Sequence, residues 1–209
     1  MFKNRGLFSD LSLWDDFVSS LLYPAILGSL IYEFTNFHLN IKYIFLLITL
    51  AFYVVDYFYL HYAYKEYIRK SDKKLRTPSM IRLDFVVAFL FAVIILSINK
   101  IFSTSEPSDS PLFCSIISIN VSYYFVILLS TLGIFIVACI YINDKDSNNV
   151  FILLIINTII IFSFRLLIIS CSKCHNCYFE AFIYLILVIL YTKVALDDYY
   201  NDPPIVLDK

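Results

Sequence analysis

Three cysteines and one histidine lie close together in the stretch SCSKCHNCY at 170–178. The cysteines are Cys171, Cys174 and Cys177, and Cys114 falls on the same side of the membrane in the topology that the charges favour. Four cysteines in an oxidising compartment can form two disulfides, with three possible connectivities. A structural disulfide framework is the interpretation that we favour. A zinc site that includes His175 has suitable ligand types, but ligands this closely spaced strain tetrahedral geometry.

The spacing Cys171-x-x-Cys174 also permits thiol–disulfide exchange. In this loop the chain resembles the disulfide-generating membrane oxidoreductases, which pair an outward CxxC with a second pair of cysteines. The resemblance implies exchange of electrons with a quinone. It covers this loop alone, because those proteins are smaller, have four helices and place the CxxC differently.

Charged side chains interrupt several otherwise apolar stretches. Charged groups are costly inside a bilayer, so each one is interpreted first as functional or paired. At a rise of about 1.5 Å per residue, Arg165 falls in an outer layer with Glu33 or Glu180. By the same measure, Asp56 and Lys193 form an inner layer. These pairs can simply fix helix packing, with Lys193 alternatively reaching the interface; conduction or sensing is the other interpretation.

One apolar segment carries hydroxyl groups and a carboxylate along a single stripe. Tyr53, Asp56, Tyr57 and Tyr64 fall within about 100° of helical arc, with His61 at its edge. We expect these groups to face the bundle or a second subunit rather than lipid. An aromatic inner belt with one buried, paired acid is the simpler interpretation. A proton or cation path is the alternative.

Other polar chemistry is sparse. Asn157 stands alone in an apolar segment, where it either bonds to another helix or lines a pore. The chain has no GxxxxGK, HExxH or GxSxG motif. It has only three glycines, too few for a glycine-rich phosphate cradle. We therefore expect no enzyme activity, no cofactor and no resident metal.

The composition explains where these groups reside. Hydrophobic residues make up 60% of the 209 residues and charged residues only 16%. A soluble domain is about 45–50% apolar and about 25% charged, so this excess cannot be buried in one soluble core. The composition predicts an integral membrane protein in contact with lipid. A net charge of −1 provides no reason to expect nucleic acid as a partner.

Six apolar segments approach the length of about 20 residues that a bilayer core requires. They cover 17–35, 43–64, 83–102, 121–142, 150–170 and 178–196. Helices suit these lengths, because backbone exposed to lipid must satisfy its own hydrogen bonds. The sequence therefore predicts an all-α polytopic membrane protein with about six transmembrane helices in three hairpins.

Positive charge sets the orientation of this bundle. The run 65–82 holds seven of the 16 Lys and Arg residues, and such loops stay cytoplasmic. Six crossings then place both termini in the cytoplasm, with eleven basic residues inside and three outside. We expect the basic loop to bind a cytoplasmic partner. The residues chosen for this role are Arg69, Lys70, Lys73, Lys74 and Arg76.

Two terminal segments complete the organisation. Residues 1–16 form an amphipathic lead-in with Phe8, Leu11 and Trp14 at helical spacing, a short frayed tail being the alternative. Residues 197–209 form an acidic cytoplasmic tail that could also contact a partner. No cleavable signal is expected, because acidic residues interrupt the first apolar stretch.

In size and character across the whole chain, the protein is similar to the small multi-pass membrane subunits of bacterial anti-phage systems, of which the Kiwa membrane subunit is an example. This resemblance implies a homo-oligomer in the bacterial inner membrane. The function expected from it is a non-enzymatic subunit that anchors or senses at the membrane and recruits a cytoplasmic protein. An oligomeric ion channel or pore-forming effector, a thiol–disulfide oxidoreductase and immunity to a pore-forming toxin are the alternatives.

Overall fold

The computed structural model describes residues 17–36, 41–71, 78–103, 117–141, 152–164 and 177–201, all of which are helical. The expectation of an all-α fold is confirmed. A π-helical turn η1 (Val18–Leu22) leads into α2 (Tyr23–Glu33) and a short 3-10 helix η2 (Phe34–Asn36). The long helices are α3 (Ile41–Ser71), α4 (Pro78–Ser103), α5 (Ile117–Tyr141) and α7 (Cys177–Asn201). A shorter apolar helix, Ile152–Phe164, precedes α7.

Four of these helices are long and apolar enough to cross a membrane. The stretches are Ile41–Tyr59, Ile81–Phe102, Tyr123–Ile140 and Tyr178–Leu196, and each overlaps one of the expected segments. The expected segment 17–35 corresponds to the mixed helical path of η1, α2 and η2. Within the expected segment 150–170, the structure describes helix over 152–164.

The outward faces of the long helices are apolar. Leu47 and Phe58 on α3, Leu96 on α4, Ile140 on α5 and Ile189 on α7 are each more than half exposed. A bundle that stands in water normally carries charged and polar groups on such faces. These faces are suited to lipid, as the composition predicts.

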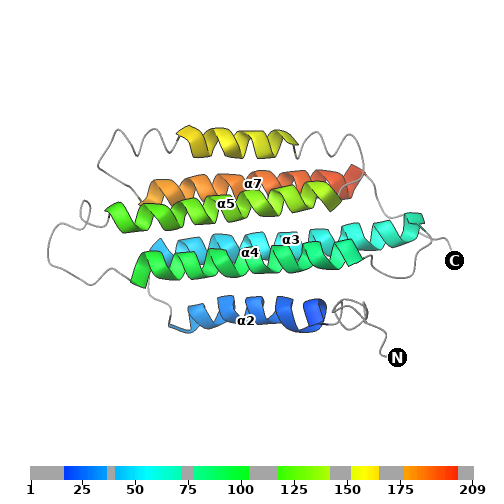
Figure 1. Cartoon of the computed structure of the whole chain (residues 1–209), viewed down its shortest axis with the longest axis horizontal. Helices are drawn as coiled ribbons and strands as arrows, with labels where there is room; N and C mark the ends of the chain where they lie inside the picture. The colour runs from blue at the N-terminus through cyan, green and yellow to red at the C-terminus, as the bar shows by residue number, and fades with distance from the viewer. Residues whose placement is uncertain are drawn as a thin grey trace, which may run out of the picture.

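Successive helical elements lie side by side and run in opposite directions (Figure 1). As a result, the start of η1, the end of α3, the start of α4 and the end of α7 all lie at one end of the bundle (Figure 1). Helices α3 and α7 run in the same direction and pack extensively against each other. We call the end that carries the basic segments of α3 and α4 the basic end.

Helix α3 is longer than its apolar stretch. Its 31 residues are about 46 Å long, and residues 65–71 extend about 10 Å past the expected apolar segment 43–64. The segment 65–82, expected to be a loop, is therefore helical over 65–71 and again over 78–82. Lys, Glu and Arg favour the helical state in the first part. Pro78 begins α4, where its missing N–H group leaves no helical bond unmade.

Pro24 changes the helix geometry immediately before it. The N–H of Tyr23 donates to the carbonyl of Val18, which is the wider spacing of a π-helical turn. Proline has no N–H to donate, and its ring crowds the carbonyl one turn earlier. The wider turn accommodates that carbonyl and leads the chain into α2.

Helices α4 and α5 pack together most extensively among the described elements. Gly133 of α5 lies at a close approach, because a Cβ atom there would stand 2.9 Å from Leu90 Cδ1 of α4. Small residues permit such approaches between helices in membranes, where packing rather than the hydrophobic effect drives association.

The interior of the four long helices is built around Phe45 and Phe52 of α3. A ring from each of the other long helices contacts Phe45, at centroid distances of 6.1, 5.5 and 6.1 Å. These rings belong to Phe102 of α4, Tyr124 of α5 and Tyr184 of α7. This set of four rings is the first aromatic layer.

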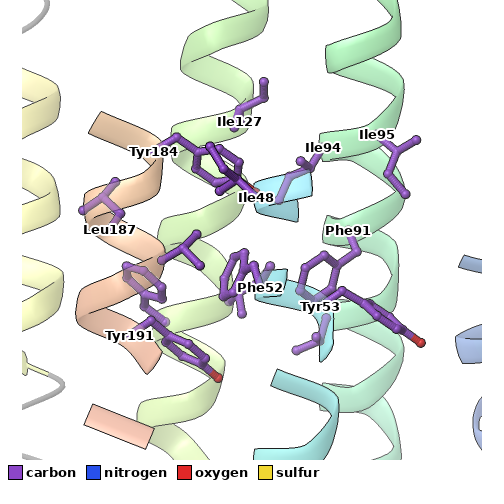
Figure 2. Close-up of a cluster of buried hydrophobic side chains, with 14 of the residues drawn as sticks. Ile48, Phe52, Tyr53, Phe91, Ile94, Ile95, Ile127, Tyr184, Leu187 and Tyr191 are labelled. Carbon is purple, nitrogen blue, oxygen red and sulfur yellow. The ribbon is translucent and has the colours of Figure 1, made fainter. Parts of the chain in front are cut away.

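Phe52, seven residues further along α3, repeats the arrangement. Its ring lies 5.1 Å from Phe91 of α4, 6.0 Å from Phe135 of α5 and 5.1 Å from Tyr191 of α7. Figure 2 shows Phe52 between Phe91 and Tyr191. Phe135 and Tyr191 are also stacked on each other, with an interplanar angle of 8°. This second aromatic layer joins all four long helices at one level.

We expect Phe52→Ala to lower the free energy of unfolding by about 2–4 kcal/mol, because it leaves a cavity between the rings of three helices. Reversible unfolding of the full chain in mixed micelles measures this change. Phe58→Ala is the matched control, since Phe58 lies on the same helix and is 67% exposed. The control should change stability by no more than about 0.5 kcal/mol. Equal losses for the two variants would contradict the proposed role of the second aromatic layer.

Candidate functional site

Helices α3 and α7 are joined by two hydrogen bonds that lie seven residues apart. Thr49 of α3 and Tyr184 of α7 share a bond of 3.1 Å between their hydroxyl oxygens. Further along both helices, the hydroxyl of Tyr191 donates to Asp56 Oδ1 over 2.5 Å. Both bonds span 135 residues of sequence, so the two parallel helices keep a single register. We call these bonds the Thr49 couple and the Asp56 couple.

The donors in both couples come from α7. Thr49 has one hydroxyl proton, and it donates this proton to the carbonyl of Phe45 over 2.8 Å. The bond between Thr49 and Tyr184 must then use the proton of the tyrosine. Since Tyr191 also donates to Asp56, both contacts present an acceptor on α3 to a tyrosine donor on α7.

Asp56 is the less completely satisfied of the two acceptors. Its side chain is fully buried, and Oδ2 has no hydrogen-bond partner within the described part of the chain. Asp84 of α4 is also buried. An incompletely bonded carboxyl group inside a membrane bundle is costly, so a carboxyl in this position points to a functional role.

Tyrosines of α2 and α3 lie around the Asp56 couple. The hydroxyl of Tyr53 points away from Tyr191 (Figure 2) and donates to the carbonyl of Tyr23 on α2 over 2.8 Å. The ring of Tyr57 lies 5.3 Å from that of Tyr23, and Tyr59 lies 6.4 Å from Tyr191. The arrangement corresponds to the simpler interpretation of the sequence, an aromatic belt around one buried, hydrogen-bonded acid.

A second polar group lies at the opposite end of the bundle. Glu33, the last residue of α2, accepts a 2.8 Å bond from Lys42 of α3 and a 3.0 Å bond from Asn99 of α4. Its carboxylate thereby ties three helices together, with its charge balanced by the lysine. The sequence suggested Arg165 as its partner; that residue lies outside the described residues, and Lys42 occupies the role of counter-ion.

The expected pairing of Asp56 with Lys193 is not formed. Lys193 is exposed, whereas Asp56 is buried and bonded to Tyr191. Two residues along a helix correspond to a rotation of about 200°, so a lysine placed two positions after Tyr191 points away from α3. Depth along the helices was the only criterion for this pairing, and depth says nothing about the direction of a side chain.

The other expected site residues are dispersed. Glu180 is buried in the first turn of α7, where the helix dipole favours an acid. Asn157 is exposed on the helix Ile152–Phe164 and does not face the interior of the four long helices.

His61, Arg69 and Lys70 lie on the extended part of α3, where the structure describes only the backbone. Cys177 begins α7 and is described in the same way. The positions outside the described residues are Lys73, Lys74, Arg76, Cys114, Arg165, Cys171, Cys174 and His175.

Across the described residues, no group of three or more Cys, His, Asp or Glu side chains is arranged to hold a metal ion. The α3–α7 contact holds two helices in a fixed register, because two donors on α7 bond to two acceptors on α3. Oδ2 of Asp56 can accept one further hydrogen bond.

The sequence interpretation missed Thr49, Tyr184 and Tyr191. A signal for them is present, since a polar residue recurs at 49 and 56 and a tyrosine at 184 and 191. The same seven-residue spacing relates Phe45 to Phe52. Such a spacing is typical of parallel helices that pack along a continuous seam. The pattern does not say which two helices are partners, so it could not be interpreted alone.

We expect Tyr191→Phe to lower the free energy of unfolding by about 1–2 kcal/mol, because it leaves both oxygens of Asp56 without a donor. Tyr184→Phe should cost less, about 0.5–1 kcal/mol, since Thr49 keeps its bond to Phe45. In an Asp56→Leu background, Tyr191→Phe should no longer destabilise the bundle. Thermal or micellar unfolding of the native chain and the four variants measures these differences. A neutral Tyr191→Phe in the native background would show that the Asp56 couple does not hold the helices together.

Neither a protein-family model, nor a curated protein, nor a solved structure matches this chain. The distribution of charge along the helices and the geometry of the α3–α7 contact are therefore the observations on which a function can be proposed.

Proposed function

We propose that this chain is a non-enzymatic subunit of a bacterial inner membrane that recruits a cytoplasmic protein through its basic end. In this proposal all six helical segments cross the membrane, with both termini in the cytoplasm and the chain in contact with lipid. The aromatic layers and the two couples form the membrane anchor. The charged extension of α3 and the start of α4 form the surface presented to the partner.

The α3 extension is the single observation that carries this proposal. The run 65–82 contains seven of the 16 Lys and Arg residues. Three of them, Lys65, Arg69 and Lys70, lie on α3, which remains helical to Ser71. A helix keeps its residues at fixed spacing along a stiff rod, whereas a loop does not. An array of cations held in this way suits recognition of an acidic surface on another protein.

The sidedness of the proposal is supported by the whole chain. The helix ends that adjoin the two termini lie at the basic end (Figure 1). In a six-span topology eleven basic residues lie on that side and three on the other, as the tendency of cations to remain cytoplasmic requires. A role in anti-phage defence and assembly as a homo-oligomer complete the proposal; both derive from the resemblance in size and character.

The Asp56 couple supports a sensing component of this function. Asp56 lies on α3 nine residues before Lys65, the first basic residue of the run 65–82. The couple joins α3, which continues into the basic extension, to α7, which includes the first five residues of the acidic tail 197–209. A change in membrane tension or lipid contact that shifts one helix would therefore move both cytoplasmic segments.

The competing functions have less support within the described residues. A channel through a single copy would have to displace Phe45 and Phe52, which are buried at the centre of the two aromatic layers. The cysteines that a thiol–disulfide oxidoreductase would use at 171 and 174 lie outside the described residues. Recruitment by the basic end requires neither a pore nor a redox centre.

The recruitment surface is tested by changing Arg69, Lys70, Lys73 and Lys74 together to Glu. We expect recovery of the cytoplasmic partner with the full chain to fall by roughly tenfold or more, because like charges then oppose one another. Affinity purification in mild detergent with quantitative mass spectrometry measures the recovery.

The matched control reverses two charges at the opposite end, Lys100→Glu and Lys173→Glu, and should leave recovery unchanged. A fusion reporter at the C-terminus establishes that each variant keeps its orientation. Undiminished recovery with the orientation preserved would refute recruitment by the basic end.

The topology has its own test, in a background where the native cysteines are replaced by serine. A membrane-impermeant maleimide should label Asp72→Cys only after the inner membrane is permeabilised. Ser108→Cys, which the six-span topology places on the outer side, should be labelled in cells whose inner membrane is intact. Labelling of Asp72→Cys from outside intact cells would invert the proposed orientation.

A further inference from the structure

The helix Ile152–Phe164 exposes an amide at the edge of an apolar surface. Asn157 lies near the centre of this helix, is exposed, and has no hydrogen bond to any described residue. The helix runs alongside α5 and α7 at the middle of the bundle rather than near either end (Figure 1). When the bundle is inserted, the amide therefore stands at the level of the hydrocarbon core, where lipid offers neither a donor nor an acceptor.

Asn157 shares a continuous face with four large apolar residues. Leu153, Ile156, Ile160 and Phe164 recur with Asn157 at spacings of three and four residues, so they line one side of the helix. All four are between 46% and 59% exposed. We call these five residues the Asn157 face.

The opposite side of the same helix is already occupied. Leu154 and Thr158 are buried, and Phe162 packs edge-on against Phe125 of α5 with ring centroids 4.9 Å apart. Thr158 satisfies its hydroxyl by donating to the carbonyl of Leu154 within its own helix. The helix therefore packs on the bundle through its Thr158 side and leaves the Asn157 face uncovered.

An apolar groove continues from the Asn157 face toward α7. It has a volume of about 310 Å³ and is lined by Ile160 and Phe164 on one side and by Phe179 and Phe182 of α7 on the other. A helix seated against the Asn157 face would also cover this groove. The apolar area and the polar group would then be buried by the same occupant.

We infer that the Asn157 face is a contact between two copies of this chain, in which the Asn157 side chains bond to each other. A carboxamide carries both an NH₂ donor and a carbonyl acceptor, so it is complementary to its own copy. All copies inserted by the same topology point the same way. A two-fold axis along the membrane normal therefore brings residues of equal number together in a parallel helix pair. Acyl chains could cover the apolar residues but would leave the amide unsatisfied.

This contact assigns Asn157 the first of the two roles that the sequence left open, a bond to another helix. A group that lined a pore through a single copy would face the interior of the bundle, whereas Asn157 lies on its outer surface. Asparagine bonded across a helix pair is a known means of association in membranes, and the interior of this chain is not involved. The inference depends on membrane insertion but is independent of recruitment by the basic end.

The test measures self-association of the full chain, labelled at the C-terminus with donor or acceptor fluorophores, in proteoliposomes at decreasing protein-to-lipid ratio. We expect energy transfer from the native chain to persist on dilution. Asn157→Leu should weaken association by roughly five- to thirtyfold, the range expected for interhelical amide bonds. Asn157→Gln should restore most of it, because the amide is retained.

Ser163→Ala is the matched control, since Ser163 is an exposed polar residue of the same helix about 120° around its axis from Asn157. It should leave association unchanged. A photo-crosslinker in place of Ile156 should trap a product of twice the mass of the chain. Unaltered association of Asn157→Leu would overturn the inference. So would the absence of self-association in the native chain, or crosslinks from this position to lipid or to a different protein alone. Because Asn157 is exposed, its replacement by Leu should leave the unfolding transition of the single chain unchanged, which separates loss of contact from loss of fold.

Discussion

The fold depends on the requirement that helix α3 satisfy its polar side chains within the protein, because lipid cannot. Four of these side chains make hydrogen bonds along the apolar stretch of α3, two with α2 and two with α7. From the outer end to the basic end they are Lys42 to Glu33, Thr49 to Tyr184, Tyr53 to the carbonyl of Tyr23, and Asp56 to Tyr191. Together these bonds set the rotation of α3 and the positions of α2 and α7 around it.

Apolar packing follows from this rotation. Ile44, Leu47, Ala51, Val54 and Phe58 form the one exposed stripe of the apolar stretch, at spacings of three and four residues. The rest of its circumference is covered by neighbours, with Phe45 and Phe52 at the centre of the aromatic layers. Interhelical attraction in a membrane comes from close packing and hydrogen bonds rather than from exclusion of water. The aromatic layers provide the close packing between four helices. The hydrogen bonds of α3 orient the helices that carry these rings.

The positions of the helices could be predicted from the sequence, because each apolar segment has the length that a bilayer core imposes. The charge asymmetry could be counted in the same way. Partners could not be predicted: Glu33 bonds to Lys42 because α2 and α3 are consecutive and antiparallel, a proximity that depth alone does not reveal. The extension of α3 through 65–71 was missed because positive charge was interpreted as a loop, although its residues favour helix. The register of α3 on α7 depends on contacts between segments 135 residues apart, which no local pattern contains.

The two couples differ in the chemical group that α3 contributes. Both are built on the same spacing, yet the outer one uses the hydroxyl of Thr49 and the inner one uses the carboxyl of Asp56. The Thr49 hydroxyl also bonds to the carbonyl of Phe45, whereas the buried carboxyl of Asp56 keeps Oδ2 without a partner in the described residues. The carboxyl stands nine residues before Lys65, on the helix that continues into the cationic extension. The two bonds therefore hold α3 and α7 in one register through acceptors of different chemistry.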